Sequence, residues 1–386
     1  MSTFSESEER QELRKAVARL AGKYGREWFT EKARAGEKTT ELWLEIGRNG
    51  YLGINIPEAY GGGGGGIGDV AAVCEELAAQ GCPLLLMVVS PAICGTIISR
   101  FGTDEQKRRW LPGIADGTGT MAFAITEPDA GTNTHNISTT ARRDGDAWAL
   151  SGRKIYISGV DEADNVLVVA RTEDARTGQV KPVLLVVPTD AEGLEYRPIP
   201  MEIVSPELQF QLFMDDVRLP ADALVGDEDG GLAQLFAGLN PERIMAASFS
   251  TGLARFALER ASAYARERTV FQAPIGTHQA IAHPLAQSKI EVELARLMTQ
   301  KAAALYDAGD DAGAGEAANM AKYAAAEAAC DAADRAVQTH GGNGITQEYG
   351  MAGLLVATRA GRIAPVSREM ILNYVAMHSL GLPKSY

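Results

Sequence analysis

The spacing of apolar residues changes twice along this chain, and that change restricts its possible folds more than any other feature. Up to about residue 120, and again from residue 231, apolar residues recur at helical intervals; between Met121 and about Gly226 they alternate or form short runs. Intervals of three to four residues indicate amphipathic helices, and a period of two indicates strands. We therefore predict an α+β fold with an N-terminal helical domain (1–120), a middle β domain (121–230) and a C-terminal helical bundle (231–386).

Helical patterns are clearest in two sets of segments. In the N-terminal part we expect helices over residues 6–24, around 42–46, over 69–79, around 92–101 and after Thr103, where Gln106 has the spacing of a capping box. In the C-terminal part we expect helices over residues 242–266, 280–307, 317–339 and 367–380. Their polar faces are narrow, which is typical of a bundle packed on several sides.

Strand patterns fill the middle of the chain. Residues 166–170, 183–187 and 210–214 are rich in Val and Leu and are bounded by Gly, Pro and Asp. The Asp144-Gly145 pair stands between two alternating segments, which is a strong hairpin pattern. The spacing predicts seven or eight strands.

Six consecutive glycines, Gly61 to Gly66, contain a Gly-x-Gly-x-x-Gly match when Gly68 is included. Such a match is expected by chance in a polyglycine run, and the residues before it do not form a clean strand. We therefore interpret the run as a flexible loop between helices and not as a dinucleotide-binding motif.

Charge and cysteine content exclude some classes of function. With 37 basic and 50 acidic residues the formal charge is −13, which disfavours nucleic acid and anionic membranes as partners. The four cysteines lack metal-binding or redox spacing, and the polar, acidic residues 1–10 do not resemble a signal peptide. The longest apolar run, residues 84–89, is too short to cross a bilayer. We expect a cytoplasmic protein with no metal site.

Residues 123–159 carry the most informative motifs. An apolar segment runs into Thr126-Glu-Pro-Asp-Ala-Gly131-Thr132, and the later strand ends in Tyr156-Ile-Ser158-Gly159. Pro and Gly break the first strand into a turn, and the hairpin at Asp144 brings the chain back. The two strand ends should therefore lie side by side and offer hydroxyls, backbone N–H groups and the Tyr156 ring to a flat polar ligand.

This pair of motifs resembles the acyl-CoA dehydrogenase family, and the resemblance extends over nearly the whole chain. It implies a helical N-terminal domain, a barrel-like middle β-sheet and a C-terminal four-helix bundle. It also implies FAD as the cofactor, because in that family these two segments hold the isoalloxazine ring. The alternative for each residue alone is a strand hydroxyl bonded to its own backbone or an aromatic ring filling the core.

Further motifs match the family's other FAD contacts. Arg268-Thr-Val-Phe271 resembles the segment that meets the pyrophosphate and adenine of a neighbouring subunit's FAD, and Gln338-Thr-His-Gly341-Gly342 resembles a glycine-rich segment that approaches the dinucleotide. The resemblance thus implies a homo-oligomer, in particular a tetramer. The cofactor-binding residues it implies are Phe123, Ile125, Thr126, Thr132, Tyr156, Ser158, Arg268, Phe271, Gln279, Gln338, Gly341, Gly342, Ser367 and Glu369.

The catalytic base is where the chain departs from many family members. Those members carry a Glu near the C-terminus, but the best register here places Pro365 at that position, and Pro365 also lacks the N–H that polarises the thioester carbonyl. Isovaleryl- and long-chain acyl-CoA dehydrogenases instead carry the Glu on a helix of the C-terminal domain, followed by Arg. Glu242-Arg243 matches that pattern.

Glu242 also has a structural interpretation. Asn240-Pro241-Glu242 reads as a helix start, with Asn240 as N-cap and Pro241 at the first helical position, where a Glu favours the helix dipole. We nevertheless predict Glu242 as the base. The resemblance implies that Arg243 meets the CoA portion of the substrate and that Thr132 also contacts the substrate; a surface Arg is the alternative for Arg243.

We therefore predict an FAD-dependent enzyme that desaturates an acyl-CoA thioester at C2–C3 and passes electrons to an electron-transfer flavoprotein. Two alternatives stay open: an oxygen-using flavin monooxygenase or oxidase on the same fold, favoured by the missing C-terminal Glu, and a non-enzymatic helical interaction protein. Acyl chain length, branching and the choice between CoA and a carrier-protein thioester are not predicted by the sequence.

Overall fold

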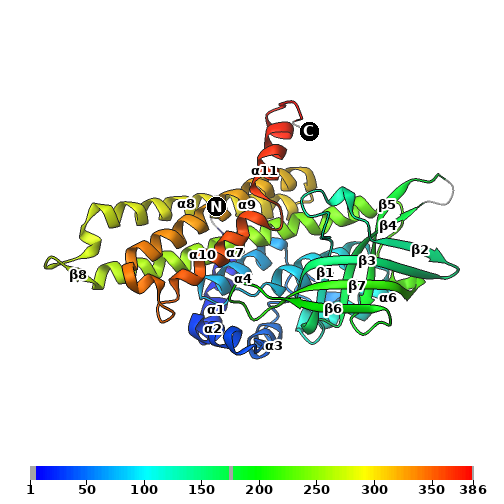
Figure 1. Cartoon of the computed structure of the whole chain (residues 1–386), viewed down its shortest axis with the longest axis horizontal. Helices are drawn as coiled ribbons and strands as arrows, with labels where there is room; N and C mark the ends of the chain where they lie inside the picture. The colour runs from blue at the N-terminus through cyan, green and yellow to red at the C-terminus, as the bar shows by residue number, and fades with distance from the viewer. Residues whose placement is uncertain (1–5, 174–176, 385–386) are drawn as a thin grey trace.

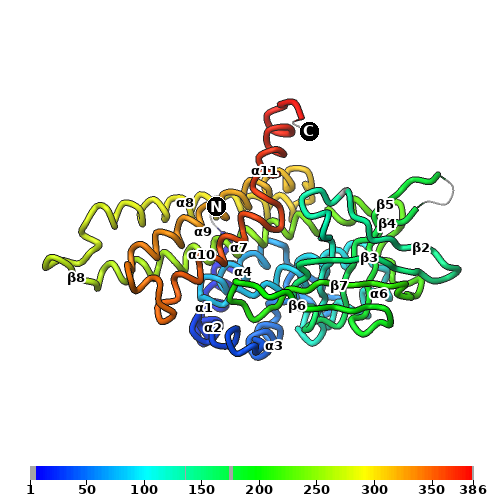
Figure 2. Tube along the Cα trace, viewed as in Figure 1, coloured from blue at the N-terminus to red at the C-terminus, as the bar shows by residue number. Residues whose placement is uncertain are grey.

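The computed structural model describes residues 6–173 and 177–384 (Figures 1 and 2). Residues 1–5 and 385–386, the ends of the first and last predicted domains, lie outside the described residues. Helices form the first part of the chain, a curled β-sheet the second and long helices the third, which confirms the predicted α+β fold. Figure 1 shows the sheet at one end of the long C-terminal helices, with the first helices packed alongside them.

Within the described residues, the N-terminal part contains helices and loops but no strand. Its elements are α1 (Glu8–Ala21), α2 (Gly25–Ala35), α3 (Thr40–Arg48), the 3-10 helix η1 (Glu58–Tyr60), α4 (Ile67–Ala79), the π-helical η2 (Val88–Gly95), α5 (Thr96–Phe101) and α6 (Asp104–Asp116). Nearly all of α4 and all of η2 are buried, so they form the centre of this part. The capping box of Thr103 and Gln106 is confirmed at the start of α6. The sequence patterns did not predict α2.

The glycine run forms a loop before α4, as predicted. It is hydrogen-bonded along its length, because the N–H groups of Gly63, Gly64 and Gly65 donate to carbonyl groups of residues 53–56 at 2.7–3.0 Å. A Cβ atom at Gly62 would lie 2.0 Å from the Ile56 carbonyl oxygen, so the close approach of two backbones requires glycine there. The segment before the loop contains no strand within the described residues.

Seven strands form one sheet within the described residues. They are β1 (Met121–Ala124), β2 (Thr140–Asp144), β3 (Ala147–Ser158), β4 (Asn165–Glu173), β5 (Val180–Pro188), β6 (Leu194–Ile199) and β7 (Gln209–Pro220). The order is β1-β4-β2-β3-β7-β6, with β5 paired to β4. The predicted hairpin is confirmed, since Asp144 of β2 pairs with Ala147 of β3 and Gly145 has a φ of 62°.

Long helices dominate the C-terminal part. They are α7 (Gly231–Glu267), α8 (Gln279–Asp307), α9 (Asp311–His340), α10 (Met351–Ile363) and α11 (Arg368–Tyr374), which continues as the π-helical η8 (Val375–Ser379). The short strands β8 (Thr269–Val270) and β9 (Ala273–Pro274) form a hairpin between α7 and α8. No helix in the described part of the chain is both long enough and apolar enough to cross a membrane. Alanines fill most of the buried face of α9, so neighbouring helices pack closely against it.

The predicted helix start at Asn240 is wrong. Helix α7 begins nine residues earlier, at Gly231, and contains Pro241 in its interior. Glu242 therefore does not lie in a first helical turn, and the dipole of a helix N-terminus does not explain its presence.

A buried tyrosine explains why the helix continues through a proline. Pro241 has no N–H to donate to the carbonyl of Ala237, the residue four positions earlier. The Tyr306 hydroxyl on α8 donates to that carbonyl at 2.8 Å instead. The acceptor that proline leaves free is thus satisfied from a neighbouring helix, a contact that local sequence patterns do not reveal.

Candidate functional site

The two motif segments of the β domain lie side by side, as the sequence predicted. The Ile155 N–H donates to the Thr126 carbonyl at 2.9 Å. The ammonium group of Lys154 donates to the Ile125 carbonyl and to the Glu127 carboxylate, each at 2.9 Å. The end of β3 is therefore fastened to the residues that follow β1.

Glu127 and Lys154 form a buried ion pair that the sequence analysis did not assign. The side chains are 3% and 0% exposed. Burial alone would raise the pKa of Glu127, but hydrogen bonds from Thr139 and Ser138 and the charge of Lys154 lower that pKa to about 2. Glu127 is thus a carboxylate that fixes the loop between β1 and β2. The Glu in the Thr126-Glu127-Pro128 motif was the available signal, but its partner comes from another strand.

The predicted ring-binding residues of this part of the chain lie on β1 and on the loop that follows it. Phe123 is buried within β1, Ile125 and Thr126 are half-buried, and Thr132 is exposed on the following loop. The Thr126 hydroxyl has no hydrogen-bond partner within residues 6–173 and 177–384. It is therefore available to a ligand.

The end of β3 presents one aromatic ring and one hydroxyl. Tyr156 is 57% exposed and has a φ of 59°, which is uncommon for a residue other than glycine. The register between β3 and β7 shifts between Lys154 and Ile157, so Tyr156 lies at a bulge. The Ser158 hydroxyl donates to the Gln209 side chain at 3.0 Å. An exposed ring beside polar groups suits a flat ligand with polar edges.

Glu242 lies on the face of α7 that packs on the N-terminal helices. Gly238, one turn earlier on that face, packs so closely that an added Cβ would lie 2.6 Å from Ile97. Three residues after Glu242, the Met245 carbonyl accepts a hydrogen bond from Cys74 of α4. The spacing of residues 238, 242 and 245 puts all three on one stripe. Glu242 therefore faces the interior of the molecule, although it keeps partial solvent access.

The surroundings of Glu242 make it a weak acid. Burial raises its pKa to about 7, while the positive charges of Arg243 and Lys322 act in the opposite direction. No ion-pair partner contacts Glu242 in the described part of the chain. A carboxyl group with a pKa near 7 can accept a proton and release it again at neutral pH, as a general base must.

Arg243 lies beside Glu242 and keeps one donor free. Its Nη1 donates to the Asn240 side chain at 3.1 Å. Its Nε is buried and has no hydrogen-bond partner within the described residues. An anionic ligand could accept from such a group, so the geometry is compatible with the predicted contact to CoA.

Pro365, which the sequence register aligns with the Glu of many family members, lies in the segment between α10 and α11. The Val366 carbonyl accepts a hydrogen bond from the buried ammonium group of Lys322 on α9. The Ser367 hydroxyl caps α11 by accepting from the Met370 N–H at 3.3 Å, which gives Ser367 a structural duty besides its predicted cofactor contact. Glu369 is exposed and lies 3.4 Å from Arg368.

The remaining predicted FAD contacts lie far from these segments. Arg268 and Phe271 lie at the β8–β9 hairpin, at the end of the molecule opposite the sheet (Figure 1). Phe271 is 90% exposed. Gln279 begins α8, while Gln338, Gly341 and Gly342 end α9 and open η7 (Gly341–Ile345). Within a single chain, these residues therefore lie away from Thr126 and Ser158.

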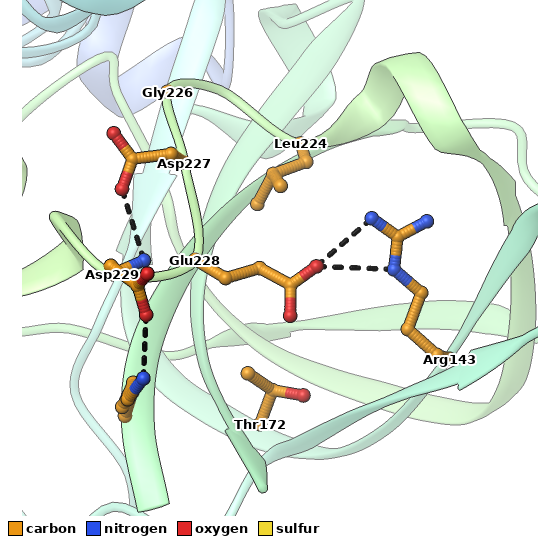
Figure 3. A pocket seen from close by; sticks show the side chains of 8 residues that line it. Arg143, Thr172, Leu224, Gly226, Asp227, Glu228 and Asp229 are labelled. Carbon is orange, nitrogen blue, oxygen red and sulfur yellow. Dashed lines mark hydrogen bonds and ion pairs between the residues drawn. The ribbon is translucent and has the colours of Figure 1, made fainter. Parts of the chain in front are cut away.

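A separate hollow of about 400 Å³ lies beside the β-sheet (Figure 3). Its lining is Arg143, Thr172, Lys181, Leu224, Gly226, Asp227, Glu228 and Asp229. Arg143 bonds Glu228 at 2.9 and 3.2 Å, and Lys181 bonds Asp229 at 2.5 Å. Both cations of this hollow pair with acidic residues that line it, and the Asp227 carboxylate accepts from the Asp229 and Gly230 N–H groups. None of the predicted site residues lines the hollow.

Comparison with known proteins covers almost the whole chain. Family models match in sequence order: the acyl-CoA dehydrogenase N-terminal domain over residues 7–118, the middle domain over 122–216 and the C-terminal domain over 229–380. The acyl-CoA dehydrogenase FadE12 of Mycobacterium tuberculosis is 65% identical over 100% of this chain and 99% of its own length.

Two solved structures have nearly the same fold. The glutaryl-coenzyme A dehydrogenase glutaryl-CoA complex has a TM-score of 0.93 at 30% identity and covers 99% of this chain and 98% of its own. A glutaryl-CoA dehydrogenase from Mycobacterium smegmatis in complex with FADH2 has a TM-score of 0.90 at 27% identity, covering 99% and 96%.

Proposed function

This chain belongs to the acyl-CoA dehydrogenase family, and from that premise we propose that it desaturates an acyl-CoA thioester at C2–C3 with FAD as cofactor and Glu242 as base. The observation that carries the proposal is the position of Glu242. It is a half-buried carboxyl group with a pKa raised to about 7 by burial, whereas the C-terminal segment has Pro365 at the position where many relatives carry their base.

The residues present fit FAD. The unpartnered Thr126 hydroxyl and the exposed Tyr156 ring offer a polar edge and an apolar wall to the isoalloxazine. Gly341 and Gly342 have no atoms within 4 Å of an added Cβ, so their backbone is open to a phosphate or ribose. The exposed guanidinium of Arg268 suits a pyrophosphate, because its forked donors match phosphate oxygens. Ile125, Thr132, Ser158, Phe271, Gln279, Gln338, Ser367 and Glu369 complete the proposed set, and Phe123 supports it from the core.

The reaction divides between cofactor and protein. Bound FAD supplies the hydride acceptor, which no amino acid side chain replaces. Glu242 takes the proton from the α-carbon of the thioester. Arg243 holds the anionic CoA portion, and Thr132 contacts the substrate from its exposed loop. Substrate binding also displaces water from Glu242, which raises the basicity of the carboxylate further.

Reduction of the bound flavin tests the base directly. Adding acyl-CoA thioesters of different chain length to the anaerobic protein should bleach its yellow colour. We expect Glu242→Gln to keep the colour and to lower the rate of bleaching by about 10²-fold or more, since it removes general-base catalysis. Glu259→Gln, an exposed residue of the same helix, is the matched control and should bleach at the normal rate. A fully active Glu242→Gln variant would refute the assignment.

An oxygen-using flavin enzyme is the second candidate. The proline at position 365 favours it, because the usual C-terminal base is missing. Rapid reoxidation by air with hydroxylated or oxidised product would support this alternative, whereas slow reoxidation by air and fast transfer to an electron-transfer flavoprotein would support the dehydrogenase. The third alternative, a non-enzymatic interaction protein, has no support from the 65% identical enzyme.

We also propose a homo-oligomer, in particular a tetramer. Support comes from the separation of Arg268, Phe271, Gly341 and Gly342 from Thr126 and Ser158 within one chain (Figure 1). A neighbouring copy would complete the cofactor site. The four buried, unpaired cysteines support a cytoplasmic location.

A further inference from the structure

Lys322 is a buried lysine that the proposed reaction does not use. It lies on α9 and is 1% exposed. Its neighbours on the same face, Ala318, Ala325 and Ala326, are buried alanines without polar side-chain atoms. Lysine is almost never fully buried unless it is paired, because an isolated ammonium group is costly to remove from water. The position therefore needs a compensating partner.

The hydrogen bond of Lys322 does not supply that compensation. The ammonium group donates to the Val366 carbonyl, between α10 and α11. A carbonyl group carries no charge, and an ammonium group has three donors. The carboxylates whose charges act on Lys322 are Glu242 on α7, Glu327 on α9 and Glu369 on α11.

Two of these three carboxylates already have arginine partners. Glu327 pairs with Arg362 at 2.8 Å and with Arg368 at 3.4 Å. Glu369 lies 3.4 Å from Arg368. Glu242 has no ion-pair partner within the described residues, and its charge is the strongest that favours the charged form of Lys322.

Lys322 also lies on the face of α9 that meets α7. Gly315, seven residues earlier on that face, packs so closely on α7 that an added Cβ would lie 3.4 Å from the Asn240 side chain. The acid without an ion-pair partner and the buried cation without one therefore complement each other.

Arg243 is the cation that acts most strongly on Glu242, ahead of Lys322. It differs from Lys322 because it has a buried Nε donor without a partner, and we propose that its guanidinium binds the anionic portion of the substrate. The charge of the Tyr374 phenol group also favours the charged form of Arg243. When the substrate's anionic groups neutralise Arg243, Lys322 is the cation that still favours an ionised Glu242.

We propose that Lys322 is a positioning residue for the reaction: its ammonium group keeps Glu242 ionised before proton transfer and anchors the 364–367 segment through the Val366 carbonyl. This inference rests on the proposed role of Glu242 as base. It assigns the lysine two separable functions, one through its charge and one through its hydrogen bond.

Two substitutions separate these functions. Lys322→Gln keeps an N–H donor for the Val366 carbonyl but removes the charge, whereas Lys322→Arg keeps the charge. The pH dependence of kcat/KM should show its acidic limb displaced to higher pH in Lys322→Gln and restored in Lys322→Arg. A displacement of about one pH unit corresponds to an approximately tenfold loss at pH 6 and little loss at pH 8.5. Lys301→Met, an exposed lysine of α8, is the control and should behave as wild type.

A readout independent of turnover completes the test. The infrared band of the Glu242 carboxyl group, identified by its loss in Glu242→Gln, should titrate at higher pH in Lys322→Gln than in wild type. An unchanged titration and an unchanged acidic limb would overturn the proposal, and so would an equal loss of activity at every pH with an unchanged titration. If wild-type protein is not reduced by any thioester, the proposed function itself fails, while the infrared titration still decides the coupling between the two residues.

Discussion

Glu207 is a carboxyl group that folding buries between two parts of the chain. It is 4% exposed, its Oε1 accepts from the Leu85 N–H at 2.9 Å, and its Oε2 accepts from the Ser205 hydroxyl at 2.9 Å. Burial raises its pKa to about 7, and the charge of Glu162 adds to this shift. The residue joins the segment before η2 to the segment before β7, which pairs with the Ser158 end of β3.

The raised pKa predicts a loss of stability as pH rises. Below pH 4.5 both states hold the proton, whereas above it the unfolded chain releases the proton first, so the free energy of unfolding falls until the pH passes about 7. The full effect is about 3 kcal/mol, because each pKa unit corresponds to about 1.4 kcal/mol. Glu207→Gln should therefore lose less stability than wild type between pH 5 and 8 in urea unfolding. The exposed Glu192→Gln should follow wild type, and parallel curves for Glu207→Gln and wild type would contradict the prediction.

Single residues also show what the sequence could and could not predict about the site. Thr126, Tyr156 and Ser158 could be proposed because their motifs are local, and the structure places their segments side by side. Glu127 and Lys154 were not assigned, because their pairing depends on how β3 folds back beside β1. The isolation of Glu242 and Lys322 from other ion pairs is likewise a property of three-dimensional packing.

At the scale of elements, α7 was predicted with the right type but the wrong start. Local rules read Asn240-Pro241 as a helix beginning, because proline is favoured at the first helical position. The helix instead continues through Pro241, because the Tyr306 hydroxyl bonds the Ala237 carbonyl that the proline leaves without a donor. Tyr306 lies 65 residues after Pro241 in the sequence (306 − 241), so local rules do not include it. The predicted helices 280–307 and 317–339 lie within α8 and α9, whereas α10 was not predicted.

The bond from Tyr306 to the Ala237 carbonyl predicts a measurable coupling with Pro241. Tyr306→Phe should lower the free energy of unfolding by about 1–3 kcal/mol, because it leaves a buried carbonyl without a donor. In a Pro241→Ala background the restored N–H can bond the same carbonyl, so Tyr306→Phe should cost less there. Urea unfolding of the four proteins forms a double-mutant cycle. Tyr323→Phe on α9 is the control, and equal costs in both backgrounds would show that the two residues are not coupled.

At the scale of the molecule, the β8–β9 hairpin, which contains Phe271 and follows Arg268, lies at the end opposite the β-sheet, whose strand β3 ends at Ser158 (Figure 2). The apolar side chains of Ile290, Leu294 and Leu297 are 62%, 62% and 49% exposed on α8. Their spacing of four and three residues forms a stripe on one face of the helix. A monomer would leave this stripe in water, so we assign it to contact with another copy, as the proposed oligomer requires.

A charge placed in this stripe should separate the copies and weaken FAD binding together. Leu294→Glu puts a carboxylate at the centre of the apolar contact, where burial without a partner is strongly unfavourable. Sedimentation velocity should show smaller species, and the purified variant should retain less FAD, because Arg268 and Phe271 of one copy are proposed to serve the cofactor of another. Val180→Glu, a comparably exposed apolar residue on β5, is the control and should leave mass and FAD content unchanged. A Leu294→Glu variant with wild-type mass would place the interface elsewhere, and a smaller species that keeps all its FAD would show that each chain holds its cofactor alone.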